Sequence, residues 1–554
     1  MNRTTIIAVA LAGLAVLAGC TAVGGQRGGG AGVPDGQWFE EVALHAGISY
    51  NTSGPHTGNG DGAVVVADYD GDGWTDLLAL GGDEPVLYHN TGGEFEASGA
   101  LPPISVTELK SGLFFDYDTD GDQDLLLVPR DDEMVFLENR DGKFVKRDVG
   151  LSVHLDWGTG ATAGDFDRDG CPDVFVTQNG NWIQTTPNRS RHLPYKDGMD
   201  NGNPNLLFDG DCQSFENVTA EAGIEQARWS LATSFVDLNG DDWPDIHVAN
   251  DYNADVVYVN QRDGTFERRV LGSRTNSHGM ASDVEDINHD GLPDIFVTNA
   301  KWNTSDKKIY LNQTGLAIRT MGNTMLVNQG NATFVDKSAE LGIRVGGWGW
   351  SGNLVDLDND GNLDLIHSTR NYLAADKDAN VTVYKGVRTY PRLWERTDDG
   401  DFRRLNATEM GLVSSSGRGL ATLDYDRDGD QDVVVADTVG RFKLYENHAG
   451  DDNHWLQVRV HGTDGQTAVG AEIHVTTAAG ETVKYQTSET NFFSQNTRVT
   501  QFGLGNRTEV TEVRVVWPDG HEVVLDDVGA DRRVDVYYDG ETEVVYADDD
   551  GGLL

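Results

Sequence analysis

One aspartate-rich unit occurs seven times along the chain, and this repeat limits the possible folds more than any other feature. In the first copy, the apolar run 63–67 precedes a loop that begins at Asp68, and Leu77 and Leu78 follow it. Each loop has Asp or Asn at positions 1, 3 and 5, and Asp at position 9. Position 6 is Gly in six copies, whereas the fourth copy has Asp242 there and Gly240 at position 4. A unit repeated in this way indicates an array of similar structural elements. The remaining loops begin at Asp116, Asp165, Asp237, Asp286, Asp356 and Asp424.

The spacing within each loop predicts a calcium site. Ca²⁺ takes about six to eight oxygen ligands, and carboxylates on alternate residues of a tight turn converge on one point. Gly at position 6 permits the positive φ of such a turn, and position 7 can donate its carbonyl oxygen. The loop is not an EF-hand, because Ala79 stands at position 12 of the first copy, where a bidentate Glu is needed. The expected ligands are Asp68, Asp70, Asp72, Trp74, Asp76, Asp116, Asp118, Asp120, Asp122, Asp124, Asp165, Asp167, Asp169, Cys171, Asp173, Asp237, Asn239, Asp241, Trp243, Asp245, Asp286, Asn288, Asp290, Leu292, Asp294, Asp356, Asp358, Asp360, Asn362, Asp364, Asp424, Asp426, Asp428, Asp430 and Asp432.

We therefore expect up to seven structural Ca²⁺ ions. Loops four and five have Asn239 and Asn288 in place of Asp, so each loses one charge and is expected to bind Ca²⁺ most weakly.

The flanking segments predict four strands per unit, which is the composition of a propeller blade. Apolar segments of strand length surround every loop, and two further short pieces follow, such as 136–139 and 144–147. The pattern resembles the FG-GAP or VCBS-type repeats of integrin α-subunit propellers over roughly residues 37–450. The expected fold is all-β: a seven-bladed β-propeller followed by a small C-terminal β domain. The seventh unit lacks its fourth strand, and 38–48 reads as a fourth strand without a blade, so this segment is predicted to close the ring.

The pattern changes after Asn453. Strand-like segments and the turns Phe502-Gly-Leu-Gly505 and Trp517-Pro-Asp-Gly520 resemble the ASPIC/UnbV domain. A propeller followed by this domain is the layout of the cartilage acidic protein family and its microbial relatives. The resemblance implies an extracellular, calcium-binding protein without a defined reaction.

The first twenty residues are typical of a lipoprotein signal peptide. A basic start and a short apolar run end in Leu17-Ala-Gly-Cys20, which resembles a lipobox with Cys20 as the lipidated residue. The expected organisation is a signal at 1–20, a Gly-rich tether at 21–36, the propeller at 37–450, the ASPIC/UnbV-like domain at 451–540 and an acidic tail at 541–554. The protein is then anchored by lipid alone at the outer face of the cytoplasmic membrane.

The formal charge is −48, which disfavours nucleic-acid partners. Seven Ca²⁺ ions would neutralise only part of it, and only 12 of the 42 basic residues are Lys, so the surface indicates salt adaptation.

In an oxidising compartment Cys171 and Cys212 are candidates for a disulfide, with two buried thiols as the alternative.

Three units carry long insertions between their second and third strands, at roughly 179–205, 299–324 and 369–391. In a propeller these connections emerge on the face opposite the first-to-second loops. The insertions combine Lys and Arg with aromatic residues, which suits an anionic or sugar-like ligand, although polar loops that pack on themselves are the alternative. Candidate residues of this ligand face are Trp157, Trp229, His278, Trp348, Lys301, Lys307 and Lys308.

Three functions remain open from the sequence. The preferred one is a non-enzymatic adhesion or recognition module that binds a cell-surface glycan or protein. The second is an enzyme acting on a polysaccharide, for which His278, Lys301 and Arg418 are the candidate residues, although none lies in a catalytic motif. The third is an assembly scaffold for surface proteins. Neither the ligand nor the oligomeric state follows from the sequence.

Overall fold

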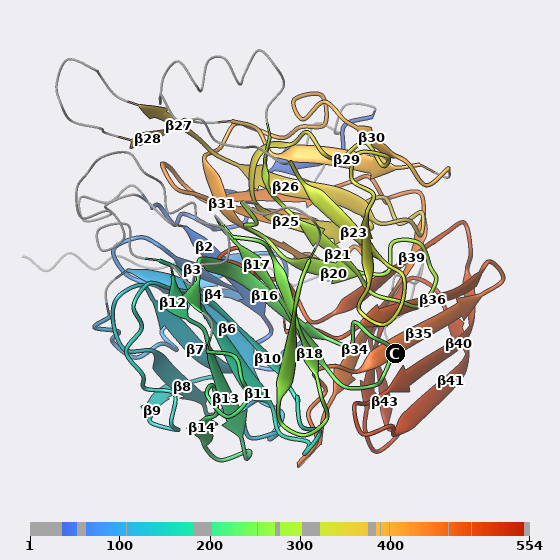
Figure 1. The fold of residues 1–554 in the computed structure, drawn as a ribbon. Helices are drawn as coiled ribbons and strands as arrows, with labels where there is room; N and C mark the ends of the chain where they lie inside the picture. Colours follow the sequence, from blue (N-terminus) through green and yellow to red (C-terminus); the bar gives the residue numbers. More distant parts are fainter. Residues whose placement is uncertain are drawn as a thin grey trace, which may run out of the picture. The chain divides into compact units, whose positions relative to one another are not determined.

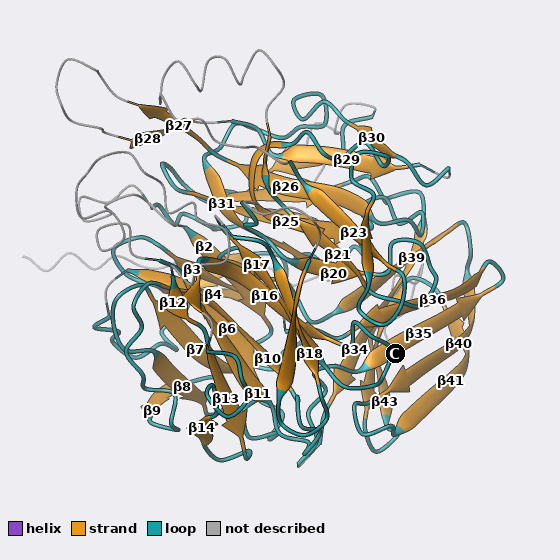
Figure 2. Cartoon of the chain, viewed as in Figure 1, coloured by secondary structure: helices purple, strands orange, loops and turns teal. Residues whose placement is uncertain are grey.

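The computed structural model describes residues 36–547 except 53–61, 107, 181–201, 226, 252, 272–277, 302–321, 375–383, 388, 398, 464 and 489. Every regular element among these residues is a β-strand (Figure 2). The described part therefore contains no helix that could cross a membrane. The predicted signal peptide, Cys20 and the tether to residue 35 lie outside the described residues.

Antiparallel units of four strands form a β-propeller, and each is built around one Asp-rich loop (Figure 1). The loop joins the first strand to the second, and the Asp at position 9 is the first residue of the second strand. We refer to each unit as a blade, numbered like its loop. In the described residues the blades are β2 Ala63–Ala67, β3 Asp76–Leu80, β4 Val86–Asn90 and β5 Phe95–Ala97; β6 Leu109–Phe115, β7 Asp124–Pro129, β8 Val135–Asn139 and β9 Phe144–Arg147; β10 Gly158–Gly164, β11 Asp173–Gln178, β13 Leu206–Gly210 and β14 Phe215–Asn217; β16 Ser230–Val236, β17 Asp245–Asn250, β18 Val256–Asn260 and β19 Phe266–Val270; β20 Asp283–Glu285, β21 Asp294–Val297, β23 Thr324–Asn328 and β24 Phe334–Asp336; β25 Gly347–Val355, β26 Asp364–Thr369, β29 Arg392–Arg396 and β30 Phe402–Arg404; and β31 Gly417–Leu423, β32 Asp432–Asp437, β33 Lys443–Asn447 and β1 Phe39–Glu41.

Burial within a blade decreases from the first strand to the fourth. All residues of β2 and β3 are buried, whereas β4 is only partly buried and β5 buries Phe95 alone. Neighbouring blades cover both faces of the inner strands, so these strands are continuous apolar runs rather than alternating ones. The all-β propeller expected from the sequence is thus confirmed.

The ring is closed by the N-terminal segment, as the sequence predicts. Strand β1 pairs antiparallel with β33, with Phe39 opposite Asn447 and Glu41 opposite Tyr445. Phe39 is fully buried and packs in the same cluster as Tyr445. The first and last described parts of the propeller therefore complete one blade and leave no unpaired edge there.

A few short strands lie on the side opposite the Asp-rich loops, all on second-to-third connections except β15, which lies between blades three and four. They are β12 Asn203–Pro204 paired with β15 Ala227–Arg228, β22 Ala300–Lys301 paired with β25, and the hairpin of β27 Asn371–Ala374 with β28 Tyr384–Val387.

The C-terminal module consists of two four-stranded sheets around a core that includes Leu456, Ile473 and Trp517. It belongs to the same compact unit as the propeller. Its strands are β34 His454–His461, β35 Glu472–Thr477, β36 Gly480–Tyr485, β37 Thr490–Asn491, β38 Ser494–Gln495, β39 Thr500–Gly505, β40 Glu509–Val516, β41 Glu522–Gly529, β42 Arg532–Tyr537 and β43 Thr542–Ala547.

The boundary placed at residue 540 is wrong, because the predicted acidic tail begins with a strand of the module. Strand β43 pairs antiparallel with β42. Its apolar residues Val544, Val545 and Tyr546 were hidden in the sequence by the acidic residues around them, and burial of Tyr546 near Asp424 holds the strand in place.

The hairpin of β37 and β38 leaves the module and enters the centre of the propeller. Thr490 pairs with Thr233 on the first strand of blade four, and Ser494 and Gln495 pair with Val64 and Val65 on the first strand of blade one. Phe492 and Phe493, at the tip, are 1% and 4% exposed. The hairpin therefore joins two blades into one ten-stranded sheet.

Polar side chains of this hairpin and its flanks bond to the first strands of other blades. Gln495 accepts from Phe114 N at 2.8 Å and donates to Phe114 O at 3.0 Å, as a strand neighbour would. Ser488 bonds to Ala163 in the same two-way manner. Buried backbone groups that face the propeller centre thereby gain partners.

The candidate metal loops

The seven loops share one backbone conformation. Position 6 has a positive φ in every copy, and so does position 4, where Thr119, Arg168 and His289 take the left-handed conformation without being Gly. In the fourth loop Gly240 occupies position 4, and Asp242 at position 6 has a φ of 67°. The fourth loop thus keeps the predicted turn conformation although its Gly stands at position 4 and an Asp stands at position 6.

Two hydrogen bonds recur in all seven loops. Oδ2 of the Asp at position 1 accepts the N–H of position 6, as from Gly121 to Asp116 at 3.0 Å. Oδ1 of the Asp at position 5 accepts the N–H of position 7, as from Leu292 to Asp290 at 3.0 Å. Because each carboxylate has a second oxygen, these bonds orient the side chains and leave oxygens available to a cation.

The Asp at position 9 accepts two backbone hydrogen bonds in addition to being an expected metal ligand. In the first blade Oδ2 of Asp76 accepts from Tyr69 N at 3.1 Å, and Oδ1 accepts from Asn90 N at 2.8 Å. The same pair of bonds occurs in every blade, so this Asp joins the start of the loop to the end of the third strand.

Replacement of Asp294 by Ala should therefore destabilise the protein even in excess chelator. Asp294 is fully buried, and its loss leaves the N–H groups of Ile287 and Asn328 without their acceptor. We expect the free energy of unfolding, measured by urea denaturation, to fall by about 2–4 kcal/mol. The control is Asp290→Ala in the same loop, whose side chain is exposed. Equal effects of the two substitutions would contradict this role.

A repeated Asn was overlooked in the sequence as a structural residue. It ends the third strand, and its Nδ2 donates to the carbonyl of loop position 2 in the preceding blade. Asn139 bonds to Tyr69 O at 2.6 Å, and Asn328 bonds to Leu238 O at 2.9 Å. Its regular occurrence before a Gly-containing turn was the available signal. Blades three and six have Gly210 and Arg396 at this position instead.

Burial and mutual repulsion make the loops unfavourable for uncompensated negative charge. Burial raises the pKa of Asp76 and of Asp124 to about 9. Burial, followed by repulsion from Asp360, raises the pKa of Asp356 to about 8. A divalent cation among these carboxylates would favour their ionised forms.

The residues present fit a metal ion best in loops 1, 6 and 7. One oxygen at position 1 is buried there without a hydrogen-bond partner among the described residues: Oδ1 of Asp68, of Asp356 and of Asp424. Such a buried oxygen is costly unless a cation or donor meets it. Carboxylate oxygens of Asp356, Asp358 and Asp360 lie within 4.8 Å of one another, as do those of Asp68, Asp70 and Asp72.

In loops 2 to 5, backbone N–H groups bond to Oδ1 of the first Asp instead, as from Asp120 N to Asp116 and from Asp169 N to Asp165 in loops 2 and 3. In loop 4, Oδ1 of Asp237 accepts from Asn239 N and Gly240 N, and the Arg262 guanidinium forms an ion pair with Asp241 at 2.8 Å. In loop 5, Oδ1 of Asp286 accepts from Asn288 N and Asp290 N. Loops 4 and 5, for which the sequence predicts the weakest Ca²⁺ binding, thus share this arrangement with loops 2 and 3.

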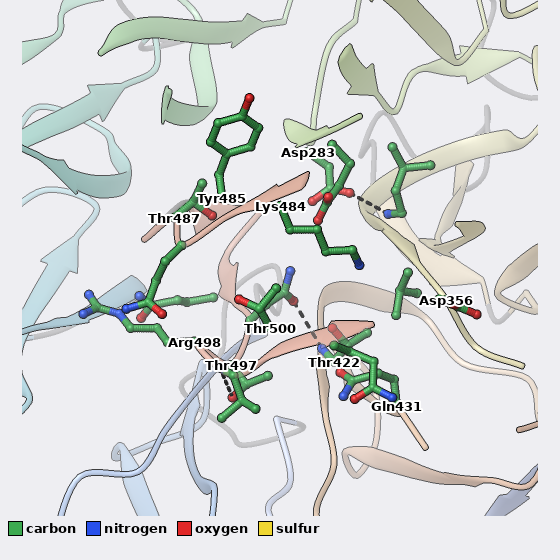
Figure 3. A pocket seen from close by; sticks show the side chains of 18 residues that line it. Asp283, Asp356, Thr422, Gln431, Lys484, Tyr485, Thr487, Thr497, Arg498 and Thr500 are labelled. Atoms are coloured by element: carbon green, nitrogen blue, oxygen red, sulfur yellow. Dashed lines mark hydrogen bonds between the residues drawn. The ribbon is translucent and has the colours of Figure 1, made fainter. Parts of the chain in front are cut away.

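The C-terminal module lies over the loops. Arg459 Nη1 is 2.7 Å from Asp68 Oδ2, and Gln457 Nε2 donates to Asp424 Oδ2 at 2.8 Å. A cavity of about 90 Å³ remains between the module and the propeller, and Lys484 of the module extends into it near Asp356 (Figure 3). Sequence analysis did not predict this cover, because nothing local to the loops or the module specifies it.

Cys171, at position 7 of loop 3, forms a disulfide with Cys212 in the turn between β13 and β14. The bond closes a loop with a sequence separation of 41 residues.

Replacement of both cysteines by Ser should lower the free energy of unfolding by about 2–4 kcal/mol, because the unfolded chain loses a constraint. The measurement is urea denaturation, and the wild-type protein in reductant should match the double variant. An unchanged midpoint would contradict a structural role of this bond.

The candidate ligand-face residues differ in accessibility. Trp229 is 1% exposed and His278 is 3% exposed, and His278 Nδ1 lies 2.6 Å from Asp251 Oδ1. Trp157 is partly exposed beneath Arg130, and Trp348 stacks on Trp350 at 5.5 Å.

The basic candidates are described only in part. Lys301 is partly buried on β22, whereas Lys307 and Lys308 lie outside the described residues. Arg418 is 8% exposed and stacks on Trp350 at 3.8 Å, on the side away from the Asp-rich loops.

Comparison with known proteins agrees with this architecture. The FG-GAP-like repeat matches residues 68–127, 116–176 and 207–297, and the "ASPIC and UnbV" family matches residues 462–543. The chain thus carries FG-GAP repeats followed by a C-terminal ASPIC/UnbV domain. It is distantly homologous to cartilage acidic protein 1: the Homo sapiens and Mus musculus proteins are each 24% identical over 317 residues. The alignment covers 56% of this chain in both cases, and 44% and 45% of those relatives, so the chain spans less than half of their length.

Solved structures show weaker likeness. A chain in the crystal structure of BBS1N in complex with ARL6DN is 9% identical to this chain. The match covers 72% of this chain and 95% of that chain, with a TM-score of 0.40. AofleA from Arthrobotrys oligospora is 15% identical to this chain. The match covers 66% of this chain and 88% of the AofleA chain, with a TM-score of 0.33. These TM-scores are too low to support any argument about function.

Proposed function

We propose that this chain is a calcium-binding extracellular recognition protein. Calcium would be held by the Asp side chains of the loops, with loops 1, 6 and 7 as the strongest sites, and it would stabilise the propeller without taking part in a reaction. The buried, unpartnered oxygens of Asp68, Asp356 and Asp424 carry this proposal, because a cation is the partner that they lack. The distant homology to proteins named cartilage acidic protein 1 supports the extracellular location.

The ligand-binding surface in this proposal is the propeller face opposite the Asp-rich loops. The module already contacts the loop face through Arg459, Gln457 and Tyr546. The described ends of the three insertions lie on the opposite side, and the insertion sequences contain Lys, Arg and aromatic residues. Such a surface suits an anionic glycan or a protein displayed on a cell, and lipidation at Cys20 would hold the protein at the outer face of the membrane.

The test is a binding screen of glycans and surface proteins against the full chain, in high salt, with and without chelator. Variants that replace Lys301, Lys307 and Lys308 by Gln should lose binding, whereas Lys146→Gln on the exposed strand β9 should keep it. Equal binding by both variants would contradict a ligand site on the insertion side.

The alternative function is turnover of an acidic polysaccharide. The observation that favours it is the 2.6 Å contact between His278 Nδ1 and Asp251 Oδ1, a pairing that can orient a general base. Release of oligosaccharides by the wild-type protein, abolished in His278→Gln, would replace the recognition proposal by this one.

A further inference from the structure

The three loops with an unpartnered oxygen on the first Asp are neighbours in the ring; loop 2 has such an oxygen at its third position, on Asp118. Loops 6, 7 and 1 precede the second strands of consecutive blades, and β31 of blade seven packs against β25 of blade six and β2 of blade one. The side chain of Asp68 is 6% exposed, and Asp356 and Asp424 are 3% and 8% exposed. No other loop presents a position-1 carboxylate oxygen of this kind among the described residues.

The C-terminal module approaches the first Asp in each of these three loops. Its hydrogen bonds with loops 2, 3 and 5 involve other positions, at Thr119, Arg168, Gly170 and Gly291. Its Arg459 meets Asp68 in loop 1, and its Gln457 and Tyr546 both donate to Asp424 Oδ2 in loop 7, at 2.8 and 3.1 Å. In loop 6 the module's backbone comes close, since a Cβ added to Gly503 would lie 2.0 Å from Asp356 Oδ2. Module side chains bond to the same loop, from Asn453 Nδ2 to Asp358 O at 2.7 Å and from Gln501 Nε2 to Asn359 Oδ1 at 2.8 Å. Strand β39 therefore lies directly against this loop.

The groups that the module supplies do not compensate the charge that it helps to bury. Loop 7 receives two neutral donors, Gln457 and Tyr546, although it contains Asp at positions 1, 3, 5, 7 and 9. Loop 1 has four carboxylates and receives two guanidinium groups: Arg459 at Asp68, and Arg533, which already pairs with Asp535, at Gly73 O. Burial of ionised carboxylates costs free energy unless a cation accompanies them. The docked module therefore favours a filled loop over an empty one.

We propose that docking of the C-terminal module and Ca²⁺ binding to loops 6, 7 and 1 are coupled. Each event raises the affinity of the other by the same factor, as linkage requires. The inference rests on the proposed calcium-binding function and assigns its regulation to one sector of the ring. It predicts a tight class of sites in this sector and an independent, weaker class elsewhere.

The first test is calorimetric titration of the calcium-free full chain with Ca²⁺. Gly503→Val should push β39 away from loop 6, because its side chain would meet Asp356 and the backbone of Asn359. We expect the tight class to weaken by about tenfold or more in this variant, with the weaker class unchanged. Val524→Thr, on a 45% exposed residue of the same module, is the matched control and should behave as wild type.

The second test uses hydrogen exchange and remains informative if Gly503→Val fails to fold. Calcium removal from the wild-type chain should increase exchange at Thr490–Gln495 and on β39, but not on β40 within the module's own core. Asp424→Asn in loop 7 should produce the same increase in the presence of Ca²⁺. Asp237→Asn in loop 4 should not.

The outcomes separate the two proposals. Absence of any Ca²⁺ binding in the wild-type titration would overturn the proposed calcium function. Ca²⁺ binding that is equally tight in wild type and folded Gly503→Val would overturn only the coupling. Exchange at Thr490–Gln495 that does not respond to calcium removal would likewise overturn the coupling alone.

Discussion

Removal of calcium is expected to lower the midpoint of thermal unfolding of the full chain by about 10 °C or more. Each site filled at one hundred times its Kd stabilises the folded state by about 2.7 kcal/mol, so even three such sites contribute about 8 kcal/mol. The carboxylates of empty loops would in addition be buried close to one another without a cation; burial, with a smaller contribution from neighbouring Asp residues, raises the pKa of Asp356 and of Asp76. Calorimetry of the protein in chelator and in millimolar Ca²⁺ measures the difference.

Readdition of Ca²⁺ should restore the midpoint, which separates metal loss from any effect of the chelator itself. The triple variant Asp68→Asn, Asp356→Asn and Asp424→Asn should lose most of the calcium-dependent shift. A chelated protein that unfolds at the same temperature as the calcium-loaded one would contradict the metal assignment.

Replacement of Phe492 by Ala is expected to lower the free energy of unfolding by about 3–5 kcal/mol, as for other fully buried aromatic residues. Phe492 packs against Trp350, with ring centroids 5.0 Å apart, and against Phe493 at 4.0 Å. It also belongs to the core cluster that contains Val65 and Phe114 of the first two blades. The substitution would open a cavity where the module and the propeller meet, so both should unfold together at lower urea concentration.

The matched control is Val524→Ala, an exposed position of the same module, which should change the free energy by no more than about 0.5 kcal/mol. Intrinsic tryptophan fluorescence follows unfolding in both variants. A loss below about 1 kcal/mol for Phe492→Ala would mean that the hairpin tip contributes little to the core.

Much of the blade structure follows from short-range patterns. The spacing of Asp and Gly fixes the loop conformation, because the turn and its hydrogen bonds involve residues no more than a few positions apart. The missing fourth strand of the last blade and the unpaired segment before Asp68 together predicted the pairing of β1 with β33.

Interpretation of the sequence failed in two situations. One is a strand whose acidic residues obscure its apolar pattern, and the other is a residue whose hydrogen-bond partner lies in another blade. Strand β43 was taken for an acidic tail, because its place in the module depends on pairing with β42 and on the contact of Tyr546 with Asp424 rather than on its own composition. The Asn residues at the third-strand ends were given no role from the sequence, although Asn139 donates to Tyr69 O of the preceding blade. Their partners are about one blade away in sequence, so no local pattern identifies them.

The sequence by itself determined the repeated loop, the strands around it and the closing of the ring, since each depends on the order of nearby residues or on complementary ends. Only the tertiary structure decided that the C-terminal module inserts Phe492 and Phe493 into the propeller and covers the loops. It also decided which loops keep an unpartnered carboxylate oxygen. These features arise from residues hundreds of positions apart, such as Asp68 and Arg459, whose meeting depends on how two complete β structures pack.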